Sequence, residues 1–154
     1  MIEVCEAVSV VLREAIPLEP QAIPLADALG LVLAEDIHAD ADSPPFDKSQ
    51  VDGFAIRLQD CATSLPVIEV VSAGQIPKRV LDQPAAIQIM TGAPVPVGAD
   101  AVVQIEFTSS QADAAGQTLV SIPSKIASWK PGTNILRQGM STRSGDLVVA
   151  AGSE

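Results

Sequence analysis

Residues 86–107 read AIQIMTGAPVPVGADAVVQIEF, and this stretch indicates the kind of fold to expect. Two apolar runs, Ala86 to Met90 and Asp100 to Phe107, flank a loop of glycines, prolines and alanines. Short apolar runs bounded by such residues are typical of β-strands joined by turns. The stretch therefore predicts a strand, a rigid exposed loop and a second strand.

Similar apolar runs lie on both sides of it, at residues 53–57, 66–72 and 118–122. Several short strands with frequent turns favour a small sandwich or barrel. Proline-marked crossings follow Ala41 and Pro123. We therefore expect residues 48–123 to form a β-rich domain, inserted into a first domain made of residues 1–47 and 124–154.

The two chain ends carry the remaining periodic segments. Residues 2–15 place apolar side chains at spacings of three and four, which predicts an amphipathic helix. Residues 25–29 predict a helical turn that stops at Gly30, residues 31–37 a strand that packs against another element, and residues 146–150 a last strand. The expected fold class is α+β, mainly β.

Composition excludes several classes of function. The net charge is -10 and the sequence has no Lys/Arg cluster, which disfavours a nucleic-acid or anionic-membrane surface. The apolar run Val8 to Leu12 is too short for a signal or membrane segment, so we expect a cytoplasmic protein. Cys5 and Cys61 fit neither a disulfide framework nor a zinc site, and we expect both to be reduced.

Asp52 is the first candidate functional residue. It lies in PPFDKSQVDGFA, residues 44–55, where two prolines fix the approach and Asp52-Gly53 permits a tight turn. A carboxylate aimed outward from such a turn could hold a cation or a polar ligand. The alternative is a simple hairpin turn at Asp52-Gly53 with Ser49 as a local cap, which the residues alone favour.

Thr91 is the second candidate, because a loop stiffened by proline would hold its hydroxyl in a rigid exposed position. The alternative is a plain connection between strands, with Asp100 bonding backbone amides. His38 has no partner at motif spacing and is expected to be a surface or packing residue. The sequence contains no GxGxxG, GxxxxGK[ST], HExxH or GxSxG motif, which are common signatures of nucleotide, zinc or serine-hydrolase chemistry. If these residues take part in catalysis, we expect them to do so together with a partner.

Four strings of the sequence are LADALGLVLAED at 25–36, PPFDKSQVDGFA at 44–55, Ala73-Gly74 and MTGAPVPVGADAVVQIE at 90–106. Together they resemble the N-terminal region of the molybdopterin molybdenumtransferases, the MoeA and gephyrin-type family. The order and spacing of these strings match that region across nearly the whole chain. The resemblance implies an enzyme that uses Mg²⁺ and molybdate to convert adenylylated molybdopterin into molybdenum cofactor with release of AMP.

The resemblance also implies an elongated homodimer, with the active-site cleft between a third domain of one subunit and the inserted β-rich domain of the other. The third domain is absent from these 154 residues, so we expect the isolated chain to be inactive and to hold no tightly bound cofactor. By motif match, Asp52 and Thr91 are the expected cleft residues, with Asp52 a possible Mg²⁺ contact. Ser49, Asp100 and Glu106 are expected to bind substrate or brace these loops.

Several positions depart from the family pattern, and three of them lie in one stretch. Leu136, Met140 and Ser141 replace an Arg and two acidic residues in the stretch that begins at Asn134. These changes could weaken the first domain's bracing or the dimer. They leave open an alternative function, a non-catalytic dimerisation or scaffold module.

Overall fold

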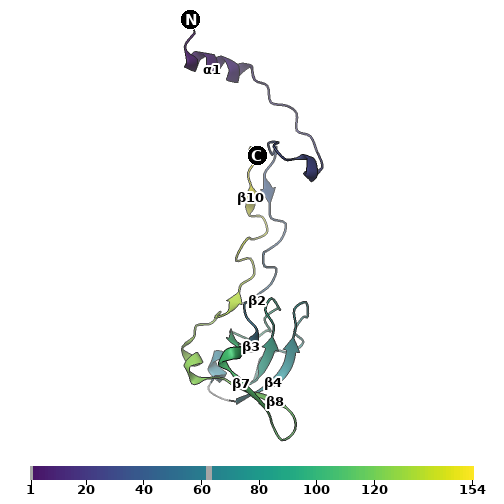
Figure 1. The fold of residues 1–154 in the computed structure, drawn as a ribbon, viewed down its shortest axis with the longest axis vertical. Coiled ribbons are helices and arrows are strands. Elements are labelled where there is room, and N and C mark those ends of the chain that lie inside the picture. The colour runs from purple at the N-terminus through teal and green to yellow at the C-terminus, as the bar shows by residue number, and fades with distance from the viewer. Residues whose placement is uncertain (1, 62–63) are drawn as a thin grey trace. The chain divides into compact units, whose positions relative to one another are not determined.

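The computed structural model describes residues 2–61 and 64–154, which form one α-helix, short 3₁₀ turns and ten mostly short strands (Figure 1). They group into two compact units: Met1–Ile37 with Leu147–Glu154, and His38–Asp146. The first unit is therefore built from both chain ends. The predominance of strands confirms the predicted fold class.

The first unit contains α1 (Val4–Glu14), the 3₁₀ turn η1 (Leu25–Asp27) and β10 (Leu147–Val149), which pairs with β1 (Ile37–His38). The predicted helix and the predicted helical turn are confirmed. In the described residues 2–61 and 64–154, no helix combines the length and the apolar character that crossing a membrane requires.

The predicted strand over residues 31–37 is wrong except at Ile37. Leu33 exchanges two backbone hydrogen bonds of 2.8 Å, one with Ser153 and one with Gly152, but no ladder extends from them. Its apolar neighbours Leu31 and Val32 are exposed, so the described part of this unit supplies no sheet on which such a strand could pack.

The second unit is organised around a six-stranded sheet in the order β6-β3-β5-β4-β8-β7 (Figure 1). The strands are β3 (Gly53–Ile56), β4 (Ser64–Val71), β5 (Ala86–Ile89), β6 (Ala101–Gln104), β7 (Ser109–Ala112) and β8 (Thr118–Ser121). All neighbours are antiparallel except β4 and β5, which are parallel. A parallel pair needs a long crossover, and residues 72–85 provide it.

Short elements complete this unit. Strand β2 (Lys48–Ser49) pairs with β9 (Ile135–Leu136), and the 3₁₀ turns are η2 (Leu58–Asp60), η3 (Ile105–Phe107) and η4 (Ser124–Ser128). The predicted run at residues 100–107 is a strand only as far as Gln104. Strand β7 was not predicted, because its sequence SSQA lacks the β-branched, alternating pattern of a half-buried strand.

The sheet buries side chains on both faces, because successive residues of a strand point in opposite directions. Ala55, Ile87 and Val102 belong to one buried cluster, which also includes Ala93 and Ile135. Phe54, Ile56 and Val103 belong to the other. Ala93, in the loop that carries Thr91, is fully buried and packs in the first cluster, so it anchors this loop to the sheet.

The compact units divide the chain at positions different from the predicted domain boundaries. Residues 38–47 and 124–146 group with the β-rich unit, whereas the sequence assigns them to the first domain. Backbone hydrogen bonds such as Ser43 N–H to Thr142 and Gly139 N–H to Pro44 join these two segments within the unit. The assignment of 1–47 and 124–154 to one domain stays a prediction.

Candidate functional site

Asp52 and Thr91 lie in direct contact at the surface of the second unit. The Thr91 backbone N–H and its hydroxyl donate to Asp52 Oδ1, at 2.6 and 2.8 Å. Both residues are exposed, although 38 residues separate them in the sequence. The two loops singled out from the sequence therefore meet, and a carboxylate and a hydroxyl stand together on one open surface.

Gly53 explains why Asp52 is placed as it is. It is the first residue of the buried strand β3, which pairs with β5 and β6 rather than with β2, so the hairpin alternative is wrong. A Cβ at Gly53 would lie 1.9 Å from the carbonyl oxygen of Val103. Glycine is required here by close backbone approach, and this approach fixes Asp52 at the end of a central strand.

Ser49 joins the Asp52 loop to the Thr91 loop. Its backbone N–H donates to the Ala93 carbonyl at 3.0 Å, and its carbonyl accepts the Gly92 N–H at 2.8 Å. The side chain is buried and donates to the Val51 carbonyl at 2.6 Å. This geometry makes Ser49 a structural brace, which is one of the two roles expected for it.

Asp47 and Arg137 form a second brace that the site predictions missed. The Arg137 guanidinium and the Gln138 N–H both donate to the Asp47 carboxylate. The Asp47 carbonyl in turn accepts the Val95 N–H at 2.9 Å. Burial alone would raise the pKa of Asp47, but these donors outweigh it and hold the pKa below its ordinary value. The pairing could not be read from spacing, because Arg137 lies 90 positions away.

Asn134 also supports the loop that carries Asp52. Its φ of 60° lies in the left-handed region, and its side-chain amide donates to the Val102 carbonyl at 2.8 Å. Its carbonyl accepts the Gln50 N–H at 3.0 Å. Asn tolerates this backbone conformation better than most residues do, so Asn134 suits the position. Leu136 remains in the β2–β9 pair, while Met140 and Ser141 are exposed.

The other predicted residues occupy separate places. Asp100 Oδ1 accepts the Leu58 N–H at 2.8 Å, so it does bond a backbone amide. Glu106 is exposed in η3, and His38 is exposed with Nδ1 3.0 Å from the Gly145 carbonyl. Cys5 and Cys61 are free thiols. None of these residues joins Asp52 and Thr91 through a hydrogen bond found among the described residues.

The Thr91 donors stabilise the ionised form of Asp52. The backbone hydrogen bond from Thr91 and then its hydroxyl lower the pKa of this exposed carboxyl below the ordinary value. Both bonds end on Oδ1, which leaves Oδ2 free of any hydrogen bond from the described residues. An exposed carboxylate oxygen of this kind is a suitable ligand for a hard cation such as Mg²⁺.

Asp52 alone would not hold a metal ion tightly. No cluster of three or more His, Cys, Asp or Glu side chains suited to a metal occurs in residues 2–61 and 64–154. Mg²⁺ sites commonly combine one or two carboxylates with water and substrate phosphates. The donor set therefore fits one contact to an ion that arrives with a phosphorylated ligand.

The chain matches the family model "MoeA N-terminal region (domain I and II)" over residues 2–154. It is 37% identical over 158 aligned residues to a molybdopterin molybdenumtransferase of Staphylococcus epidermidis, covering 98% of this chain and 36% of that protein. The corresponding protein of Bacillus subtilis is 36% identical, with 88% and 32% covered.

Solved structures agree with this match. The molybdopterin biosynthesis MoeA protein of Pyrococcus horikoshii OT3 superposes with a TM-score of 0.80 at 34% identity, covering 96% of this chain and 39% of that one. The chain thus spans about a third of the length of the curated relatives it matches.

Proposed function

Because this chain belongs to the MoeA N-terminal family, we propose that it forms one wall of the active-site cleft of a molybdenum-cofactor biosynthesis enzyme. The proposed reaction inserts molybdate into adenylylated molybdopterin and releases AMP. The names of the relatives support molybdopterin as the substrate class. The contact between Asp52 and Thr91 is the observation that carries the proposal.

Asp52 and Thr91 would act as one unit. Thr91 stabilises the ionised form of Asp52 through Oδ1, and Oδ2 can face a cation or a polar substrate group. Mg²⁺, when bound, would supply neutralisation of substrate phosphate charge. Gly53, Ser49 and the Asp47–Arg137 pair would keep the carboxylate and the hydroxyl in place without touching substrate.

The remaining part of the site would come from outside this segment. A net charge of -10 makes the chain by itself a poor site for an anionic pterin phosphate and an oxyanion. The rest of the polypeptide would supply most of the cations, and a second subunit would close the cleft. We therefore propose a homodimer, in which each β-rich unit serves its partner. A cytoplasmic location stays a prediction.

The test is a hybrid enzyme. Residues 2–154 would replace the matching segment of the Bacillus subtilis relative, followed by assay of molybdate-dependent AMP release. We expect Asp52→Asn to lower the rate about tenfold or more and Thr91→Val to lower it by a smaller factor. Asp113→Asn is the matched control, because Asp113 also accepts two backbone N–H groups but lies in the β7–β8 turn.

Two results would count against the proposal. A hybrid that folds but releases no AMP would reject the reaction for this chain. If the hybrid is active and Asp52→Asn keeps the full rate, the role of Asp52 is rejected but the reaction is not.

A non-catalytic scaffold is the second candidate function. It is favoured by Leu136, Met140 and Ser141, which replace residue types usual in the family. It is also favoured by the apolar side chains of α1, none of which is buried. Light scattering that finds a dimer, together with an inactive hybrid, would select this function.

A further inference from the structure

The crossover between β4 and β5 runs beside the loop that carries Thr91. At its start, the Val71 carbonyl accepts the Met90 N–H at 3.1 Å. At its far side, the Leu81 N–H donates to the Val97 carbonyl at 2.9 Å. Residues 72–81 are therefore held at both ends against residues 90–97.

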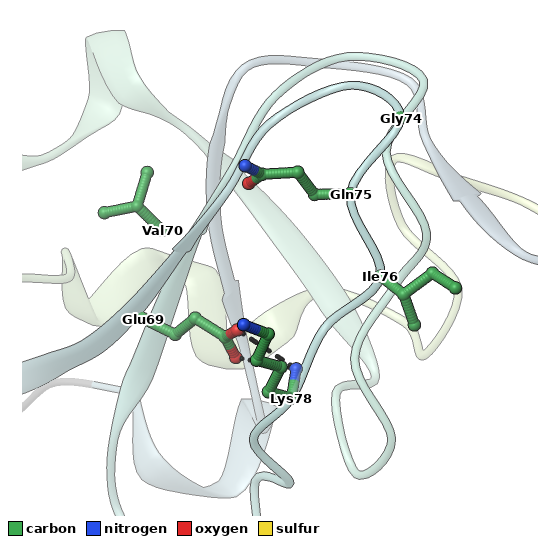
Figure 2. A pocket seen from close by; sticks show the side chains of 6 residues that line it. All are labelled: Glu69, Val70, Gly74, Gln75, Ile76 and Lys78. Carbon is green, nitrogen blue, oxygen red and sulfur yellow. Dashed lines mark hydrogen bonds between the residues drawn. The ribbon is translucent and has the colours of Figure 1, made fainter.

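Glu69 fixes the middle of this crossover. Its carboxylate accepts the Lys78 N–H through Oε1 and Oε2, at 3.0 and 3.1 Å, and the Arg79 N–H through Oε2 at 2.9 Å. Figure 2 shows Glu69 directed at the Lys78 backbone beneath the turn at Gly74 and Gln75. These residues line an open hollow of about 500 Å³. The backbone that presents Lys78 and Arg79 is thus ordered.

Lys78 and Arg79 are the only two adjacent basic residues in the sequence. Three other arginines form ion pairs: Arg13 with Glu14, Arg57 with Asp60 and Arg137 with Asp47. Lys78 and Arg79 are exposed and have no ion pair with any of the described residues. On a chain of charge -10, two adjacent cations thus stand on one exposed segment, with the Glu69 carboxylate at their backbone, and this modifies the expectation drawn from overall charge.

A groove of about 210 Å³ lies between this basic pair and the Thr91 loop. Its apolar lining comes from Ile76, Pro77, Val80, Pro94, Pro96 and Val97. Proline rings and branched side chains offer flat apolar contact, and Lys78 and Arg79 belong to the same lining. The volume is below that of a whole ligand site, so the groove would take one part of a larger molecule.

We propose that this groove binds a phosphate-bearing heterocycle of the substrate, with Lys78 and Arg79 contacting the phosphate and the proline-rich wall contacting the ring. The inference rests on the proposed function and deepens it. Thr91 and Pro94 are three residues apart, at most about 10 Å of extended chain. One extended anionic ligand can therefore reach both the groove and the Asp52–Thr91 pair.

Binding can be tested without enzyme activity. The 154-residue chain, labelled with ¹⁵N, would be titrated with AMP up to about 10 mM, since a partial site should bind weakly. We expect amide shifts at residues 76–80 and 94–97 and none in the β7–β8 hairpin. Adenosine, which lacks the phosphate, should shift the same amides far less, and inorganic phosphate should shift mainly residues 78 and 79.

A charge-matched pair of variants isolates the role of the cations. Lys78→Gln/Arg79→Gln should raise the Kd for AMP about tenfold or more, because the charge-assisted contacts are lost. Lys125→Gln/Lys130→Gln removes the same charge elsewhere and should leave the Kd within about twofold. In the hybrid enzyme, the first variant should raise KM more than it lowers kcat.

The outcomes separate this proposal from the proposed function. Absence of shifts in the groove, or equal effects of the two double variants, overturns the groove even if the hybrid is active. Shifts in the groove with a hybrid that folds but releases no AMP overturn the function and leave the groove as a general phosphate site.

Discussion

The two compact units contain similar apolar residues, but only one of the units buries them. Among the described residues of the unit His38–Asp146, eighteen hydrophobic residues are buried, and seventeen of them belong to the two clusters on the faces of the six-stranded sheet. In the unit formed by the two chain ends, no described residue is buried. Apart from the half-buried Leu33, its valines, leucines and isoleucines are exposed, with Leu12 at 71% and Leu29 at 97%.

This difference shows that apolar composition alone does not make a core. The sheet brings strands from distant parts of the sequence together, so each apolar side chain meets several others. The chain ends offer one helix and short extended segments, and the described residues of this unit form no second layer against them. Exposed apolar side chains in such number are typical of an interaction site, which supports the proposed dimer.

Replacement of Gly53 should have the largest effect on stability. Gly53→Ala would place a methyl group 1.9 Å from the Val103 carbonyl oxygen, between two paired strands that cannot separate without loss of the sheet. We expect a loss of roughly 3 kcal/mol or more of unfolding free energy. Urea denaturation followed by circular dichroism measures it.

Gly74→Ala is the matched control. Gly74 also has a conformational reason to be glycine, with φ of 81°, but no atom lies within 4 Å of the added Cβ. The expected cost is about 1 kcal/mol. Equal losses for the two variants would contradict the packing explanation for Gly53.

Core truncation sharpens the contrast between the two units. Ile87 is fully buried in β5, so Ile87→Ala should cost roughly 2–5 kcal/mol. Leu12→Ala in α1 should change the unfolding free energy by no more than about 0.5 kcal/mol at concentrations where the chain is monomeric. A larger, concentration-dependent effect of Leu12→Ala would mean that α1 is covered by a second copy.

The Asp47–Arg137 brace should give a smaller, pH-dependent effect. The pKa of Asp47 is lowered in the folded chain, so its stabilising contribution is present above the unfolded pKa of about 3.9. The contribution is lost as the pH falls through the folded value. Because the carboxylate is 34% exposed, it should amount to less than about 1 kcal/mol.

Arg137→Gln removes one of the donors that lower this pKa. Unfolding free energies measured from pH 7 to pH 2.5 should then decline less steeply below pH 4 than those of the unchanged chain. Identical slopes would exclude Arg137 as a contributor to the folded pKa of Asp47.

Local patterns indicated the two loops of the candidate site, whereas the family resemblance singled out Asp52 and Thr91. Glycine, proline and the polar residues between them marked the loops at 44–55 and 90–100, but the residues alone favoured a hairpin turn and a plain connection there. The contact between Asp52 and Thr91 agrees with their choice, and their role in the site stays a prediction. The Asp47–Arg137 pair and the link from Glu69 to Lys78 and Arg79 were not predicted. Each joins residues whose separation carries no periodic signal, 90 positions in the first case.

By itself, the sequence determined the helix Val4–Glu14, most of the strands and the acidic character of the chain, because periodicity, turn residues and charge are properties of neighbouring residues. The tertiary structure decided which strands pair, including the parallel pair β4 and β5, and it placed the Thr91 donors on Asp52. These are long-range contacts. They form only where the free energy gained by packing the whole sheet exceeds the entropic cost of closing the loops between them.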